Sequence, residues 1–200
     1  MDFKRINVGI VGFGTVGAGV VENLQRNGEL IAKRTGIRPV IHRIADLDIT
    51  TDRGVQVDPG RLTTDAHAVL NDPETDVVVE LVGGTTVAKT FILAALAAGK
   101  PVVTANKALL ADRGDEIFAA AKASSADVYY EASVAGGIPI IKVMREGLVG
   151  NEIVDIVGIL NGTCNYILTR MEQEGAPFDE VLAAAQAAGY AETPPDLDID

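Results

Sequence analysis

The sequence contains no tryptophan and only one cysteine, and aromatic residues make up 4% of its 200 residues. With Cys164 alone, no disulfide can form within the chain, and nothing indicates an oxidising compartment. No apolar run approaches the roughly 20 residues that a membrane-spanning helix needs, and the first residues show no signal-peptide pattern. We therefore expect a soluble, cytoplasmic protein.

Basic residues are also scarce. Lysine and arginine total 17 against 28 acidic residues, which gives a formal net charge of −11. This excludes a broad nucleic-acid surface, because contact with the phosphate backbone needs clustered positive charge. The two histidines are isolated from each other, which disfavours a zinc site.

Hydrophobic residues are plentiful at 48%, and they alternate between two patterns along the chain. Short apolar runs bounded by turn residues are typical of buried strands, and longer runs with apolar spacing of three and four are typical of helices. Strands are predicted at 6–11, 40–45, 77–82, 101–104 and 128–131, and helices at 17–34, 86–98 and 109–123. This order predicts an α/β fold with a doubly wound parallel sheet, in which ligands bind beyond the carboxyl ends of the strands.

A glycine loop, Gly12-Phe-Gly14-Thr-Val-Gly17, joins the first strand to the first helix. The first glycine allows a tight turn, the second lets backbone approach a pyrophosphate, and the third lets the helix pack on the strand. Amides at the start of the helix then face the negative charge. Together with Asp46 at the end of the second strand, the loop predicts a dinucleotide site in a Rossmann-type domain.

The choice between NAD and NADP stays open at this point. An acidic group after the second strand favours a free ribose hydroxyl, whereas a nearby arginine favours a 2′-phosphate. Asp46 and Asp48 lie beside Arg43 and Arg53 in the sequence, so either coenzyme is compatible with it. Asp46 could also be a turn residue that ends the strand.

Two polar segments close the next strands, at 80–84 and 104–107. Both fall along the crevice where the nicotinamide end of a coenzyme would lie, which makes Gly83 and Thr104 candidates for coenzyme contact. Lys107 could stabilise a developing negative charge on a substrate oxygen, or it could be a solvated residue at the start of a helix.

A change of pattern near residues 133–139 predicts a domain boundary. A first domain of residues 1–135 is followed by a predicted helix at 140–146, an apolar strand at 153–160 and a helix from about Cys164, within residues 136–200. The glycine-rich turn at 131–139 could hold a cation through oxygen ligands or could act as a hinge.

The last two polar segments have open roles. Asn161 or Thr163 can cap a helix whose amides suit a carboxylate, and the acidic segment 189–200 could bind an ammonium group or be a solvated tail. Cys164 is expected to pack in a core rather than to act as a nucleophile, because no histidine lies near it in the sequence.

These segments, in this order, resemble homoserine dehydrogenase. The resemblance covers nearly the whole chain, and its most specific stretches are Glu-Ala-Ser-Val-Ala-Gly-Gly-Ile-Pro at 131–139 and Asn-Gly-Thr-Cys-Asn-Tyr at 161–166. It implies an NAD- or NADP-dependent oxidoreductase that interconverts aspartate 4-semialdehyde and homoserine in threonine, methionine and isoleucine biosynthesis. Residues 136–200 would then begin an α+β catalytic and dimerisation domain, with 153–160 in the sheet of a homodimer interface.

The resemblance also implies roles for single residues. By the resemblance, Phe13, Thr15, Val16 and Lys107 would contact the coenzyme. The candidate contacts that the residues themselves indicate are Gly12, Gly14, Gly17, Arg43, Asp46, Gly83 and Thr104. A sodium site would be formed by Glu131 and the carbonyls of Val134, Gly136 and Ile138. The substrate pocket would be lined by Gly162, Thr163, Tyr190, Glu192 and Asp198, with Lys107 facing the substrate as a positioning group.

The sequence departs from the family pattern at two places. Pro194 stands where the family usually has aspartate, and the lysine held to be the family's proton donor is expected beyond Asp200. We therefore expect this chain to bind coenzyme and to turn over substrate poorly. The alternatives are a dehydrogenase for another small aldehyde or amino acid, such as aspartate dehydrogenase, and a non-catalytic nucleotide-binding module.

Overall fold

The computed structural model describes residues 2–159 and 161–191, in two compact units, Met1–Val149 and Gly150–Asp200. Each unit is described by itself. No helix among the described residues is both long and apolar enough to cross a membrane.

The first unit is built on a parallel sheet of six strands in the order β3-β2-β1-β4-β5-β6. The order reverses between β1 and β4, which creates the crevice typical of doubly wound sheets. The strands are β1 Lys4–Val11, β2 Ile37–Ala45, β3 Leu62–Thr63, β4 Val77–Glu80, β5 Val102–Thr104 and β6 Val128–Tyr129.

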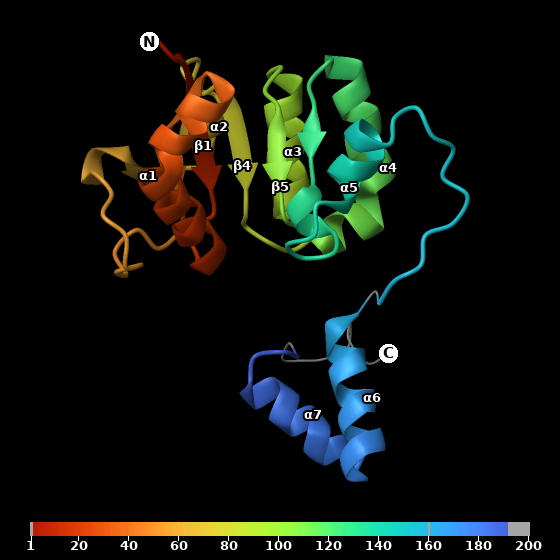
Figure 1. The fold of residues 1–200 in the computed structure, drawn as a ribbon. Coiled ribbons are helices and arrows are strands. Elements are labelled where there is room, and N and C mark those ends of the chain that lie inside the picture. The colour runs from red at the N-terminus through yellow and green to blue at the C-terminus, as the bar shows by residue number, and fades with distance from the viewer. Residues whose placement is uncertain (1, 160, 192–200) are drawn as a thin grey trace. The chain divides into compact units, whose positions relative to one another are not determined.

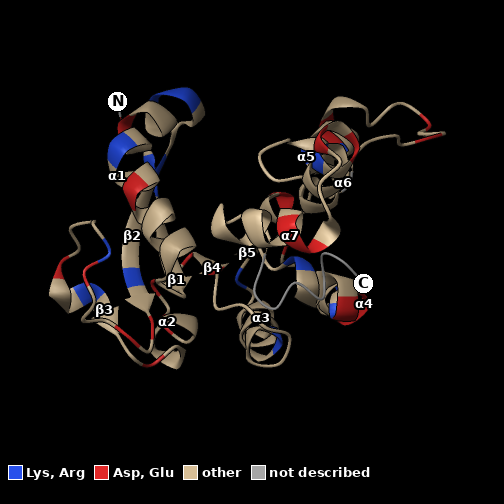
Figure 2. Cartoon of the chain, turned by 90° about the horizontal axis from the view of Figure 1, so that it is seen from below, with Lys and Arg blue, Asp and Glu red and all other residues tan. Residues whose placement is uncertain are grey.

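Helices cover both faces of this sheet (Figures 1 and 2). The residues of α1 pack with Ile10 and Ile44 on one face, whereas α2, α3 and α4 pack with Val78 and Val102 on the other. All four of these strand residues are fully buried, which explains why the central strands are almost entirely apolar. The helices are α1 Thr15–Thr35, α2 His67–Leu70, α3 Val87–Ala97 and α4 Lys107–Ser124.

The unit ends with short helical turns after β6. A 3-10 turn, η2 at Glu131–Ser133, is followed by α5 Ile140–Lys142 and the π-helical turn η3 Val143–Gly147. The compact unit thus continues to Val149, beyond the boundary that we place at residue 135.

The predicted strands and helices of the first 130 residues all form, with ends that shift by at most three residues. The short 3-10 turn η1 Pro59–Arg61, β3 and α2 lie in a region without a predicted element. Their apolar runs are too short to show a period, and β3 pairs with β2 over only two residues.

The predicted strand at 153–160 is wrong for the residues that the structure describes there. Residues 152–159 form neither helix nor strand, and five apolar side chains in this segment are 42–96% exposed. A strand needs a neighbour for its backbone hydrogen bonds, and the described residues of the second unit contain no strand.

The second unit contains two packed helices, α6 Gly162–Glu174 and α7 Phe178–Ala187. Asn161 caps α6, because its Oδ1 accepts the N–H of Cys164 at 2.9 Å. The small core of this second unit contains Ile167, Val181 and Ala185. The capping role of Asn161 and the helix after it are as the sequence predicts.

Candidate functional site

The glycine loop has the close contacts that its spacing predicts. Gly12 has a φ of 101°, and a Cβ placed there would lie 2.5 Å from the backbone carbonyl of Leu81. A Cβ on Gly17 would lie 2.3 Å from the carbonyl oxygen of Gly12. Both positions therefore require glycine, the first for its turn and the second for helix-on-strand packing.

Gly14 has a different environment. It precedes α1 as the N-cap, no side chain caps the helix there, and nothing lies within 4 Å of a Cβ added to it. Open space above a helix N-terminus is the arrangement that accepts a phosphate group, because the first amides of the helix have no partner within the helix. The residues fit the pyrophosphate of a dinucleotide.

Asp46 follows β2 and faces this loop. Its Oδ2 accepts the N–H of Phe13 at 2.5 Å, and its Oδ1 accepts the N–H of Asp48 at 2.8 Å. The second bond forms a local turn, so Asp46 both ends the strand and presents a carboxylate beside the loop. The two roles that the sequence leaves open for Asp46 are compatible.

A pocket of about 540 Å³ lies beside the loop at the carboxyl ends of β1, β2, β3 and β4. Its size suits the adenosine half of a dinucleotide. Of the residues that the structure describes, Asp46 and Asp65 are the acidic ones in its lining, and none of the lining residues is lysine or arginine. Figure 2 shows acidic segments in the loops beside β3 and α2. The lining residues are Val11, Gly12, Gly14, Ala45, Asp46, Leu47, Thr64, Asp65, Ala66, His67, Leu81, Val82, Val87 and Phe91.

The two candidate arginines bind acidic residues outside this pocket. Nε of Arg43 lies 3.7 Å from Oδ2 of Asp72, and Nη2 of Arg53 lies 3.2 Å from Oδ2 of Asp48. Arg43, a candidate coenzyme contact, therefore lies in an ion pair and not in the pocket lining.

A buried polar network lies at the ends of β4 and β5. Glu80 is fully buried, and its carboxylate accepts the N–H of Val82 and the hydroxyl of Thr104, both at 2.8 Å. Thr104 Oγ1 in turn accepts the N–H of Asn106 at 3.1 Å, and the Asn106 side chain donates to the carbonyl of Gly84 at 2.8 Å. Thr104 is 1% exposed, so its side chain positions these loops and does not reach their surface.

Four of the candidate coenzyme contacts are exposed around the carboxyl ends of the strands, namely Thr15, Val16, Gly83 and Lys107. Lys107 is the first residue of α4, and Asn106 caps that helix through a 3.0 Å bond from the N–H of Leu109. The candidate coenzyme contacts thus include exposed groups near the loops and buried groups, among them Phe13 and Thr104.

Glu131 binds backbone amides. Its Oε1 accepts the N–H of Ile141, and its Oε2 accepts the N–H of Lys142, each at 2.9 Å. The carbonyl of Ile138 accepts the N–H of Ile140 at 2.8 Å. The carboxylate of the candidate sodium site therefore caps α5, and one of the candidate carbonyls is already hydrogen-bonded. Val134 and Gly136 flank Ala135 in the same turn.

The candidate substrate residues belong to the second unit or lie outside the description. Gly162 and Thr163 begin α6, and the hydroxyl of Thr163 donates to the carbonyl of Tyr190 at 2.6 Å. The ring of Tyr190 also meets that of Tyr166 edge-on, at a centroid distance of 5.2 Å. Glu192 and Asp198 lie outside the described residues.

Cys164 in this unit is partly buried. Within the described chain, the structure brings together Gly162, Thr163 and Tyr190.

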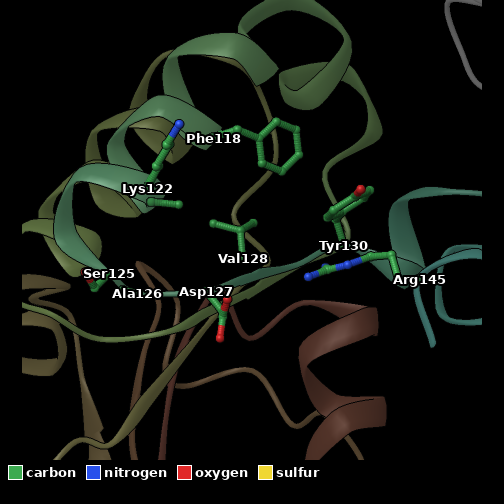
Figure 3. Close-up of a pocket in the computed structure, with 9 residues that line it drawn as sticks. Phe118, Lys122, Ser125, Ala126, Asp127, Val128, Tyr130 and Arg145 are labelled. Atoms are coloured by element: carbon green, nitrogen blue, oxygen red, sulfur yellow. The ribbon is translucent and has the colours of Figure 1, made fainter. Parts of the chain in front are cut away.

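A second hollow, of about 340 Å³, lies away from the glycine loop (Figure 3). It is formed where α4 ends and β6 begins, with Arg145 of η3 at one side. Phe118 and Tyr130 meet edge-on in its wall, at a centroid distance of 5.2 Å. It belongs to the amino end of β6, whereas ligands of doubly wound sheets bind at the carboxyl ends, so we do not assign the coenzyme to it.

Most of the pocket beyond Asp46 was missed by the sequence prediction. Five lining residues come from the segments after β2 and β3, namely Leu47, Thr64, Asp65, Ala66 and His67. They were missed because β3 is too short to be recognised from its pattern. The turn-forming residues Thr64 and Asp65, which follow Leu62 and Thr63, are a weak signal that could have located this segment.

The sheet order, the glycine loop and the acidic residue after β2 define a Rossmann-type dinucleotide-binding domain. Comparison with known sequences extends this class. Residues 12–131 match the sequence model described as homoserine dehydrogenase, NAD binding domain, and residues 139–200 match the one described as homoserine dehydrogenase. The chain belongs to the homoserine dehydrogenase family.

Relatives are similar over almost the whole chain. It is 43% identical to homoserine dehydrogenase of Bacillus subtilis and 49% identical to that of Synechocystis, over 98% of this chain and 46% and 45% of the relatives. The chain thus spans about half the length of the curated relatives it matches.

Solved structures give the same result. A homoserine dehydrogenase from Thiobacillus denitrificans has a TM-score of 0.91 at 49% identity, covering 99% of this chain and 46% of that one. A hyperthermophilic archaeal homoserine dehydrogenase in complex with NADPH has a TM-score of 0.81 at 27% identity, covering 98% of this chain and 65% of that one.

Proposed function

We propose that the protein acts as a homoserine dehydrogenase, interconverting aspartate 4-semialdehyde and homoserine with NAD or NADP in threonine, methionine and isoleucine biosynthesis. The observation that carries this proposal is the glycine-loop pocket with Asp46 in a chain that matches both the coenzyme and the catalytic parts of the family. An NADPH complex of an archaeal relative supports a nicotinamide coenzyme.

The coenzyme residues act by binding and orientation. The first amides of α1 would hold the pyrophosphate of the coenzyme, and Asp46 would accept hydrogen bonds from its adenosine ribose. A bound nicotinamide coenzyme supplies the hydride for reduction of the aldehyde carbon or accepts it in the reverse direction. The network of Glu80, Thr104 and Asn106 fixes the loops that border the nicotinamide end.

The substrate residues position the second reactant. Lys107 faces the substrate oxygen as a cation and stabilises the negative charge that develops there. Gly162 and Thr163 offer helix N-terminal amides to the substrate carboxylate, and Tyr190 borders them. Glu192 and Asp198, outside the described residues, complete the proposed pocket by holding the substrate ammonium.

A sodium ion at Glu131 and the carbonyls of Val134, Gly136 and Ile138 is a separate proposal. Both carboxylate oxygens of Glu131 accept amide hydrogen bonds, so a cation would share oxygens that already cap α5. We derive no catalytic step from it. Activity that is the same in sodium-free buffer as in sodium chloride at equal ionic strength would exclude the ion.

A cytoplasmic homodimer completes the proposed function. Val154 and Val157 are 87% and 96% exposed in an extended apolar segment, and such a segment gains hydrogen bonds and buried area by pairing with a second copy. Sedimentation of the protein should show a dimer that Val157→Lys weakens. A monomer at all concentrations would exclude this interface.

The activity is tested by following coenzyme absorbance with homoserine, and in reverse with aspartate 4-semialdehyde. Turnover of these substrates supports the proposal. Coenzyme binding with turnover of aspartate would favour an aspartate dehydrogenase. Binding with little turnover is what we expect of these 200 residues, and it would favour a nucleotide-binding module only if a chain extended past Asp200 also failed to turn over either substrate. The match of residues 139–200 to the catalytic domain of this family counts against both alternatives.

A further inference from the structure

We infer that the pocket selects NAD over NADP and that Asp46 is the residue that sets this choice. The inference rests on the proposed function, because it names the coenzyme of that same site.

The position of the Asp46 carboxylate is fixed from two sides. The N–H of Phe13 binds Oδ2 at 2.5 Å and the N–H of Asp48 binds Oδ1 at 2.8 Å. A carboxylate oxygen accepts more than one hydrogen bond, so each oxygen can still accept from a ribose hydroxyl. A ribose diol therefore meets a preorganised acceptor, and no side chain has to reorient when it binds.

The charge of the pocket lining opposes a 2′-phosphate. Asp46 and Asp65 are both acidic, and among the described residues neither a lysine nor an arginine lines the pocket. His67 is the basic residue of the described lining, and its ring meets Phe91 edge-on at a centroid distance of 6.0 Å. A phosphate monoester carries about −1.5 to −2 charges at pH 7, so NADP would place it against carboxylates.

The nearby arginines do not offset this repulsion. Arg43 is bound to Asp72, which also accepts from His42 Nε2 at 3.0 Å. Arg53 is bound to Asp48, and its Nη2 also lies 3.5 Å from the Asp48 carbonyl. Either arginine would have to leave an acidic partner to reach a phosphate, which removes much of what the new contact would contribute.

The archaeal relative that binds NADPH is 27% identical to this chain over the part that aligns. The selection that we infer depends on side chains around the pocket and not on the fold. A basic residue at the position of Leu47, which directly follows Asp46 and is 92% exposed, would have the reach to bind a 2′-phosphate.

The test measures the dissociation constants of NADH and NADPH on the full chain by coenzyme fluorescence. NADH should bind at least about tenfold more tightly. Asp46→Asn should reduce the ratio of the two constants at least about tenfold, and Leu47→Arg should tighten NADPH while retaining Asp46 and its hydrogen bonds. Asp52→Asn is the matched control, because Asp52 is exposed in the same loop and does not line the pocket.

The outcomes separate the inference from the proposed function. Equal or tighter binding of NADPH overturns the inference and leaves a dinucleotide enzyme. The role of Asp46 is also overturned if Asp46→Asn and Leu47→Arg both leave the ratio of the NADH and NADPH dissociation constants unchanged. Both variants must unfold at the wild-type temperature for this comparison. If neither coenzyme binds, the proposed function fails and the inference fails with it.

Discussion

The backbone N–H of Phe13 donates a 2.5 Å hydrogen bond to the carboxylate of Asp46, 33 residues away in the sequence. The N–H of Gly12 adds a 2.8 Å bond to the carbonyl of Ala45. These two bonds fasten the glycine loop to the carboxyl end of β2. The groups that face the pyrophosphate and the ribose are thereby held as one element before any ligand binds, which reduces the entropy lost on binding.

The glycines of this loop should differ in their effect on stability. Gly17→Ala would place Cβ 2.3 Å from the Gly12 carbonyl oxygen, and we expect it to lower the free energy of unfolding by about 2 kcal/mol or more. Gly14→Ala has open space and should change it by less than about 1 kcal/mol. Urea denaturation of both variants checks this, and equal losses would contradict the contact geometry.

The buried Glu80 carboxylate should depend on the hydroxyl of Thr104. Thr104→Val removes the donor at 2.8 Å and leaves a buried oxygen without that partner, so we expect a loss of about 1–3 kcal/mol in the free energy of unfolding. Thr104→Ser keeps the hydroxyl and should lose less. Thermal and urea unfolding measure both, and a serine variant as unstable as the valine variant would assign the effect to packing.

Glu131 should stabilise α5 as a cap. Glu131→Gln retains one oxygen acceptor for two amides, Ile141 N–H and Lys142 N–H, and we expect a loss of about 1 kcal/mol. Glu146→Gln is the control. Oε2 of Glu146 lies 3.7 Å from Nζ of Lys142, and both side chains are 67% exposed. Such exposed ion pairs contribute little to stability. If Glu146→Gln costs more than Glu131→Gln in urea unfolding, the capping role is wrong.

Asp72 should make stability depend on pH in the acid range. The N–H of Glu74 lowers the pKa of Asp72, and His42 lowers it further, against the opposing effect of burial. A carboxyl whose pKa is lower in the folded state stabilises the fold when ionised. That contribution is lost as the pH falls through the folded-state pKa.

The free energy of unfolding of Asp72→Asn should therefore change less than that of the wild type between about pH 5 and pH 2. Chemical denaturation at a series of pH values measures this dependence, with the exposed Asp52→Asn as control. Parallel curves for the wild type and Asp72→Asn would contradict it.

The order of strands and helices in the first unit can be predicted from the sequence, because the residue patterns that mark each element are local. Mainly apolar runs such as 6–11 and 77–82 mark buried parallel strands, and Gly12, Gly14 and Gly17 mark the turn from the first strand into the first helix. The coenzyme side of the site follows, since the carboxyl ends of these strands must share one edge.

The remaining features depend on contacts between distant segments. Asp65 and His67 reach the pocket only because β3 pairs with β2 over two residues. The ion pair of Arg43 with Asp72 is formed between residues 29 positions apart and has no sequence period. The segment 153–159 has the composition of a strand, but whether it forms one depends on a pairing partner and not on its own residues.

The most direct test of the account is a titration of the protein with NADH, followed by coenzyme fluorescence, in the wild type, Gly14→Ala and Lys122→Ala. Gly14→Ala fills part of the space where the pyrophosphate would bind, whereas Lys122 lines the hollow at the end of α4 and is not among the described residues that line the glycine-loop pocket. We predict saturable binding of one NADH per chain that Gly14→Ala weakens at least about tenfold and Lys122→Ala leaves unchanged. No saturable binding by the wild type, or binding that Lys122→Ala removes and Gly14→Ala retains, would contradict the account.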